Sequence, residues 1–176
     1  MQRDNVRISS ELFGAYLKCP TKCFLRSLGD ARSENGYANW VNNQEISYLD
    51  EGIKHLVEGV GQIEVVTVPM DSKEMRSPQW RLAVGTLVRT QQNLESTVHA
   101  IERLVSEGEE KSVQLIPIRL IPRNKVHKHD KLLLAFDALA LCEMLGCEVR
   151  TGKIIHGNSY VTLKSTPLPW RAKQGN

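Results

Sequence analysis

The segment 130–145 is the sequence feature that most restricts the fold, because it is a strongly apolar helix placed between β-branched runs. Its apolar side chains, from Leu132 to Met144, recur at helical spacing, with Asp130 as the expected N-cap and Gly146 just past the end. Strands are expected where β-branched and apolar residues cluster, at 63–68, 80–88, 96–104, 112–121, 152–157 and 160–164. A helix, antiparallel strands, a helix and a strand in this order predict an α+β domain.

The first part of the chain is expected to be helical. Ser9 or Ser10 can cap a helix that continues through Leu17. Pro20 interrupts this helix, and a further short helical turn is expected to end at Gly29.

Two residues conflict with the elements in which they stand. Gly52 lies inside the helix expected over 37–57, at a cost of about 1 kcal/mol relative to alanine unless a neighbour must approach closely. Pro117 lies within the run 112–121 and cannot donate to a strand ladder, so it indicates an edge strand or an irregularity.

Length and charge narrow the functional classes. The 176 residues predict a single domain over 1–165 and a flexible tail over 166–176. The formal net charge of +3 permits a nucleic-acid partner without demanding one. No apolar run approaches about 18 residues, and residues 1–6 lack the apolar core of a signal peptide. We therefore expect a cytoplasmic protein with reduced cysteines and no membrane partner.

Cys19 and Cys23 form the clearest candidate for a metal site. They stand four residues apart with Pro20 between them, and thiolates at short spacing are soft ligands for an iron–sulfur cluster or zinc. The other two cysteines, Cys142 and Cys147, lie at the end of the apolar helix. The simpler alternative is that Cys19 and Cys23 pack as small apolar side chains.

Four stretches occur in the order that is typical of one nuclease family. They are the cysteine–proline segment 16–25, a Gly-x-x-His at 52–55, the helix 130–141 and the segment 152–157. In this order they resemble the RecB-type branch of the PD-(D/E)XK nucleases, which includes CRISPR-associated exonucleases with an iron–sulfur cluster. The resemblance implies a restriction-endonuclease-like core, in which helices flank a central mixed sheet.

The resemblance also implies a divalent-metal site, which this chain matches in part. In that family two acidic residues and a lysine on neighbouring strands hold magnesium or manganese, and a helical histidine, here His55, can add a ligand. At the expected positions this chain has His99 in place of aspartate, and Arg119 and Ile121 in place of Glu-x-Lys. Arginine cannot hold a cation. A shifted metal site would use His55 and His99 together with other residues: Glu102, Gln114 and Lys125.

The implied iron–sulfur cluster also lacks part of its ligand set. Relatives with a cluster complete four thiolates with cysteines that follow the core, whereas this chain has no cysteine after Cys147. A lost cluster, a different ligand set and a chain that is a fragment of a longer protein are the three explanations.

Functions of three classes follow. The first is a RecB-like nuclease in DNA processing or defence, in which His55 and Glu102 position magnesium or manganese while His99 and Lys125 assist phosphodiester hydrolysis. The second is a catalytically inactive nucleic-acid-binding or assembly module, with DNA contacts from a basic set: Arg119, Arg123 and Lys128. The third is a protein-interaction domain whose partner is another protein or a second copy. His55 and His99 can also be ordinary packed or surface histidines.

Overall fold

The computed structural model describes most of the chain. The described residues are 7–29, 35–61, 64–67, 75, 79–105, 113–146 and 148–165. The expected tail at 166–176 and Cys147 lie outside them. Among the described helices, none combines the length and the apolar character needed to cross a membrane.

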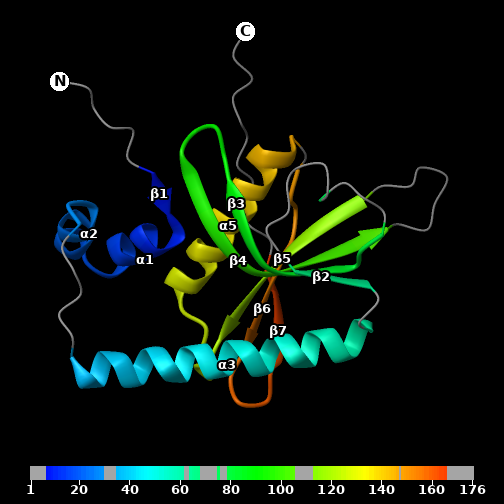
Figure 1. Ribbon diagram of the computed structural model, residues 1–176, viewed down its shortest axis with the longest axis horizontal. Coiled ribbons are helices and arrows are strands. Elements are labelled where there is room, and N and C mark those ends of the chain that lie inside the picture. The colour runs from blue at the N-terminus through cyan, green and yellow to red at the C-terminus, as the bar shows by residue number, and fades with distance from the viewer. Residues whose placement is uncertain are drawn as a thin grey trace, which may run out of the picture.

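A mixed sheet forms the centre of the described structure (Figure 1). Its strands follow the order β2-β3-β4-β5-β6-β7, and the short β1 pairs with β4. Antiparallel pairing joins β3 to β4, β4 to β5 and β6 to β7, whereas β2–β3, β5–β6 and β1–β4 are parallel. The bounds are β1 Ile8–Ser9, β2 Val65–Thr67, β3 Leu82–Arg89, β4 Leu94–Val105, β5 Val113–Ile121, β6 Gly152–His156 and β7 Val161–Ser165.

The helices agree with the sequence analysis in kind and nearly in length. Their bounds are α1 Ser10–Lys18, α2 Pro20–Ser27, α3 Gly36–Val60 and α5 Lys128–Leu145. Ser9 is the N-cap of α1, and its hydroxyl accepts a hydrogen bond from the backbone N–H of Leu12 at 3.0 Å. Pro20 separates α1 from α2 as expected and also begins α2, because its fixed φ suits the first helical position.

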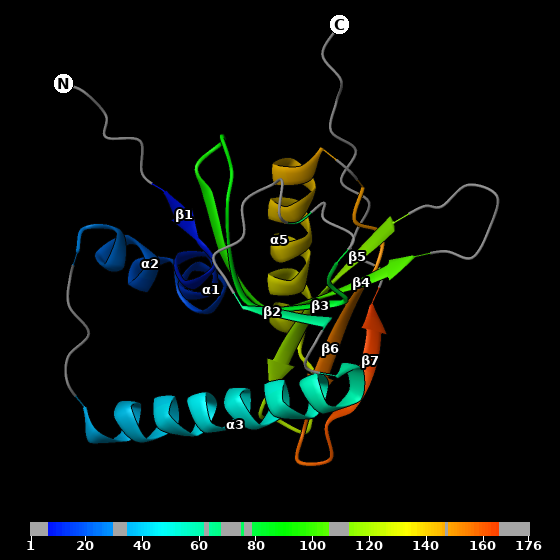
Figure 2. The ribbon, with the colours of Figure 1, turned by 45° about the vertical axis from the view of Figure 1, so that its right-hand side comes forward.

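The sheet is covered on both faces, by α3 on one side and α5 on the other (Figure 2). Alternate strand residues point to opposite faces, so Leu82 and Ala100 pack in the cluster that includes α3. Their neighbours Ala83 and Ile101 pack with α5. The expected α+β class, a mixed sheet flanked by helices, is therefore confirmed.

The first turn of α5 corrects one detail of the prediction. The N-cap is His127, not Asp130, and Asp130 occupies the third helical position. Its carboxylate accepts a hydrogen bond from the backbone N–H of His127 at 2.8 Å, so it still satisfies a helix-end donor. Gly146 ends the helix in the left-handed conformation, as expected.

The prediction that Pro117 marks an edge strand is wrong for β5 as a whole. This strand lies inside the sheet between β4 and β6, and Pro117 is a register partner of Ile101. However, the β5–β6 register begins at Ile118, one residue later. Pro117 therefore lies in the half of β5 where β6 does not follow it, which is where a residue without an N–H is tolerated.

Gly52 is required by close packing, as its position inside a helix suggested. A Cβ atom at this position would lie 2.5 Å from Leu120 Cδ2 and 3.3 Å from Tyr160 Cε1. Leu120 is buried, so α3 reaches β5 at this point because glycine has no side chain.

Replacing Gly52 by alanine should therefore destabilise the protein. Displacing Leu120 in a packed core should cost more than the roughly 1 kcal/mol that alanine contributes to a helix, for a net loss of about 1–2 kcal/mol. Gly59→Ala is the matched control, because it lies in the same helix with open space at its Cβ position. It should raise the free energy of unfolding by up to about 1 kcal/mol. Urea unfolding compares the two variants, and equal stabilisation by both would contradict the close approach.

Candidate functional site

Strands β4 and β5 separate in the middle of the sheet, and we call this point the fork. Their register runs from Val105–Val113 to Ala100–Ile118. Beyond it, β4 continues with β3 and β5 continues with β6. The His99 ring occupies the opening, where its Nδ1 accepts a hydrogen bond from the backbone N–H of Leu120 at 3.0 Å. A side chain thus replaces backbone pairing between the two strands at the fork.

A kink in β3 lies directly opposite His99. Val84 pairs with Ala100 and Thr86 with Val98, which places Gly85 across from His99. Gly85 has a φ of +63°, a conformation that glycine adopts without the steric cost of a Cβ atom. On β3, Val84 packs on the α3 side and Val88 on the α5 side, although residues four apart on a regular strand share one face. On β4, Ala100 packs on the α3 side and Val98 on the α5 side. The change of face therefore occurs on both β3 and β4, at the level of the fork.

A buried ion pair joins the fork to α5. Arg119 donates from Nε and Nη2 to the two carboxylate oxygens of Asp137, at 2.6 and 2.9 Å. The Ser96 hydroxyl donates to the same carboxylate from β4. Asp137 is fully buried, and this burial raises the pKa of its carboxyl while Arg119 and Ser96 oppose the rise. Three elements, β4, β5 and α5, thus meet at one carboxylate.

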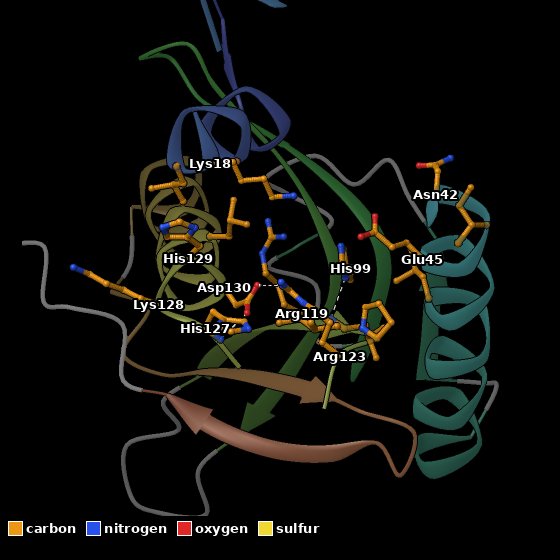
Figure 3. A pocket seen from close by; sticks show the side chains of 18 residues that line it. Lys18, Asn42, Glu45, His99, Arg119, Arg123, His127, Lys128, His129 and Asp130 are labelled. Carbon is orange, nitrogen blue, oxygen red and sulfur yellow. Dashed lines mark hydrogen bonds and ion pairs between the residues drawn. The ribbon is translucent and has the colours of Figure 1, made fainter. Parts of the chain in front are cut away.

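A pocket of about 730 Å³ opens at the fork (Figure 3), and we call it the basic pocket. Side chains of α1, α3, β4, β5 and the start of α5 form its wall, so segments distant in sequence meet there. Four permanent cations and two carboxylates are among the lining residues. The polar and charged lining residues are Lys18, Asn42, Glu45, His99, Arg119, Arg123, His127, Lys128, His129 and Asp130.

One of the two carboxylates is already neutralised. Arg123 Nη2 donates to Asp130 at 2.6 Å, and Asp130 also accepts the His127 N–H. Glu45 of α3 is the other carboxylate on the wall. With Lys18 and Lys128 added, positive charge exceeds negative charge in the basic pocket, which favours an anionic ligand.

His99 is a neutral hydrogen-bond donor in this pocket. Burial first, and then the nearby Arg119 charge, lower the pKa of His99 to about 3. Because Nδ1 accepts from Leu120, the hydrogen bond assigns the ring proton of the neutral form to Nε2. Nε2 could coordinate a metal ion only after losing that proton, so His99 is better suited to donate to a ligand oxygen.

The structure brings together some of the residues expected from the sequence. His99, Arg119, Arg123 and Lys128 all line the basic pocket. Lys125 is exposed in the loop between β5 and α5 and is not among the lining residues.

The other expected metal ligands lie outside the basic pocket. Glu102 forms an ion pair with Lys153 of β6. His55 is exposed on α3, where its ring lies 4.7 Å from the ring of Tyr160, and its Nδ1 lies 3.7 Å from a carboxylate oxygen of Glu58. These contacts give both residues partners that do not require a metal ion.

Cys19 and Cys23 lie at the start of α2. Cys19 is exposed and precedes the helix, and a hydrogen bond from the Lys22 backbone is the main cause that lowers the pKa of its thiol. Cys23 is half-buried one turn later. The third described cysteine, Cys142, lies in α5.

The residues at the positions where the resemblance predicts acidic ligands do not fit a divalent metal ion. Arg119 occupies the position expected for glutamate, and His99 presents an N–H at the position expected for aspartate. Among described residues, no three His, Cys, Asp or Glu side chains form a group that could hold a metal ion. The magnesium, manganese and iron–sulfur assignments therefore stay predictions.

Neither any protein-family model nor any curated protein matches the chain.

Sequence reasoning missed several residues of this site. Lys18, Asn42 and Glu45 reach the pocket from helices whose contacts depend on the tertiary fold. Asp137 gave a signal that could have been used, because it is a carboxylate between the apolar Phe136 and Ala138 in a core helix. A charged side chain at such a position needs a partner.

Removing one partner of the buried ion pair should destabilise the protein more than replacing both partners by apolar side chains. Asp137→Ala leaves the Arg119 guanidinium without its partner and should cost about 3–5 kcal/mol. The double variant Arg119→Met, Asp137→Leu removes both charges and should be more stable than Asp137→Ala. Urea unfolding measures the three proteins. A double variant that loses as much stability as Asp137→Ala, or more, would contradict this expectation.

His99 should make stability fall in acid. Its pKa is lower in the folded protein than in the unfolded chain, where it is about 6.5. The unfolded state therefore binds the proton first, and stability is lost as the pH falls from about 6.5 towards about 3. His99→Asn, which retains an acceptor for Leu120, should show a shallower loss than the wild type over this range. NMR should also show no titration of the His99 ring between pH 5 and 8, whereas a midpoint near 6.5 would contradict the neutral state.

Proposed function

We propose that this chain is a nuclease-derived module of the RecB-like type that binds the backbone of nucleic acid without cleaving it. The order of elements supports the restriction-endonuclease-like part of this proposal. Helix α3 is followed by the antiparallel β3, β4 and β5, then by α5, and then by β6 parallel to β5. This is the arrangement that the sequence resemblance implies.

The basic pocket is the observation on which the binding function rests. It lies at the fork between β4 and β5, where the family's metal ligands are expected, and its permanent cations outnumber its carboxylates. Lysine and arginine side chains bind phosphates with little dependence on base sequence. We therefore propose nucleic acid as the ligand class, with a role in DNA processing or defence.

The absence of turnover follows from the same residues in this proposal. A divalent ion would supply Lewis acidity and activate water for hydrolysis. Arg119 is held by Asp137, and a guanidinium has donors but no acceptor, so it cannot act as a metal ligand or as a general base. Side chains that contact phosphate without activating water give binding in place of hydrolysis.

Nucleic-acid binding should depend on salt and on the pocket cations. We expect the affinity for a fluorescent 20-mer DNA to fall as salt rises, with the logarithmic slope reduced by about 1 for each phosphate-contacting lysine removed. The Lys18→Gln, Lys128→Gln double variant should therefore bind more weakly and with a lower slope. Fluorescence anisotropy against single- and double-stranded DNA and against RNA measures this effect.

Arg150→Gln is the control for a cation removed outside the basic pocket. Arg150 is exposed beyond the C-terminal end of α5, a helix about 27 Å long by its rise per residue, whereas Lys128 lies at its start. The control should bind like the wild type. Affinity independent of salt would refute nucleic-acid binding, and cleavage of the same DNA in manganese, lost in His55→Ala, would favour the nuclease alternative.

A further inference from the structure

We propose that His99 and Arg119 form a metal-free site for a single phosphate group on the wall of the basic pocket. This inference rests on the proposed function, since it names the group of the nucleic acid that enters the fork. It differs from the salt-dependent contacts of Lys18 and Lys128, because the two residues at the fork act through directed hydrogen bonds.

Arg119 retains donors for such a ligand. Its guanidinium has five N–H bonds, of which one from Nε and one from Nη2 go to Asp137. The remaining N–H bonds have no partner among the described residues. The side chain is 11% exposed and lines the pocket. Asp137, which also accepts a hydrogen bond from Ser96, holds one edge of the guanidinium. The other edge is therefore oriented before a ligand arrives.

His99 supplies the second donor from the opposite strand. Its Nδ1 is occupied by the Leu120 N–H, which leaves Nε2–H as the ring's other polar group. Figure 3 shows His99 between Arg119 and Glu45 at the pocket wall. Phosphate oxygens are acceptors, and a neutral N–H beside a guanidinium edge matches two of them.

The surrounding charges decide how the site should respond to substitution. Asp137 offsets the charge of Arg119, and Arg123 offsets that of Asp130. Glu45 lines the same pocket and repels an anion there. Removing the charge of Glu45 should therefore strengthen phosphate binding, whereas removing the outer donor of His99 should weaken it.

The test uses dimethyl phosphate, whose single charge does not titrate near neutral pH, with EDTA present throughout. Binding is followed by NMR through the His99 ring and the backbone amides of the fork. His99→Asn keeps an acceptor for Leu120 but lacks the distal N–H, so we expect about tenfold weaker binding, the loss of one charge-assisted hydrogen bond. Glu45→Gln should bind severalfold more tightly.

Two controls separate a direct role from a change in the fold. His55→Asn is the same substitution outside the pocket and should leave binding unchanged. Arg119→Met with Asp137→Leu should abolish phosphate binding while thermal unfolding shows that the protein remains folded. A double variant that unfolds would leave His99→Asn and Glu45→Gln as the deciding pair.

The outcomes distinguish this inference from the proposed function. Unchanged phosphate affinity in both His99→Asn and Glu45→Gln would overturn the fork site, as would a wild type that does not bind dimethyl phosphate in the presence of EDTA. Salt-dependent DNA binding that survives in His99→Asn at wild-type strength would also overturn it, while leaving the proposed function intact. Phosphate binding with the expected variant effects supports the site, and failure of the wild type to bind any nucleic acid would then refute the proposed function alone.

Discussion

The buried contact between Arg119 and Asp137 is the interaction on which the rest of the site depends. A carboxylate with no exposed surface requires a partner, and the guanidinium supplies two hydrogen bonds to it. Arg119 must therefore point towards α5, which fixes how β5 lies against that helix. Ser96 adds a third bond from β4. This part of the pocket wall is consequently tied to the core by three hydrogen bonds.

The separation of the strands is the other half of this arrangement. Backbone pairing between β4 and β5 ends at Ala100 and Ile118, and a sheet normally loses stability where its ladder is interrupted. The hydrogen bond from Leu120 to His99 compensates for one lost backbone partner. The backbone N–H of Leu120 therefore keeps a hydrogen-bond partner where the strands separate. The same separation leaves space for a ligand in the basic pocket.

The sequence predicted those parts of the fold that depend on periodicity within one element. Helix α5 was expected over 130–145 and runs over Lys128–Leu145, and the long helix α3 was expected over 37–57. Strand β4 was expected within two residues of its observed ends. The fork was not predicted, because it depends on a kink opposite Gly85 and on a side chain that replaces a backbone partner. Lys18 and Glu45 were missed for the same reason, since their helices meet at the pocket through tertiary packing.

A cation carried by a side chain differs from a bound metal ion in what it can do to water. A metal ion lowers the pKa of a water ligand and so creates a nucleophile, whereas a guanidinium has donors but no site at which water can ionise. Arg119 and the neutral His99 are two donor side chains, and neither is a general base here. If a phosphate enters the fork as proposed, these residues bind its charge but supply neither a bound nucleophile nor a proton acceptor. Binding without a means to activate water does not lead to hydrolysis, which is the behaviour expected of the proposed module.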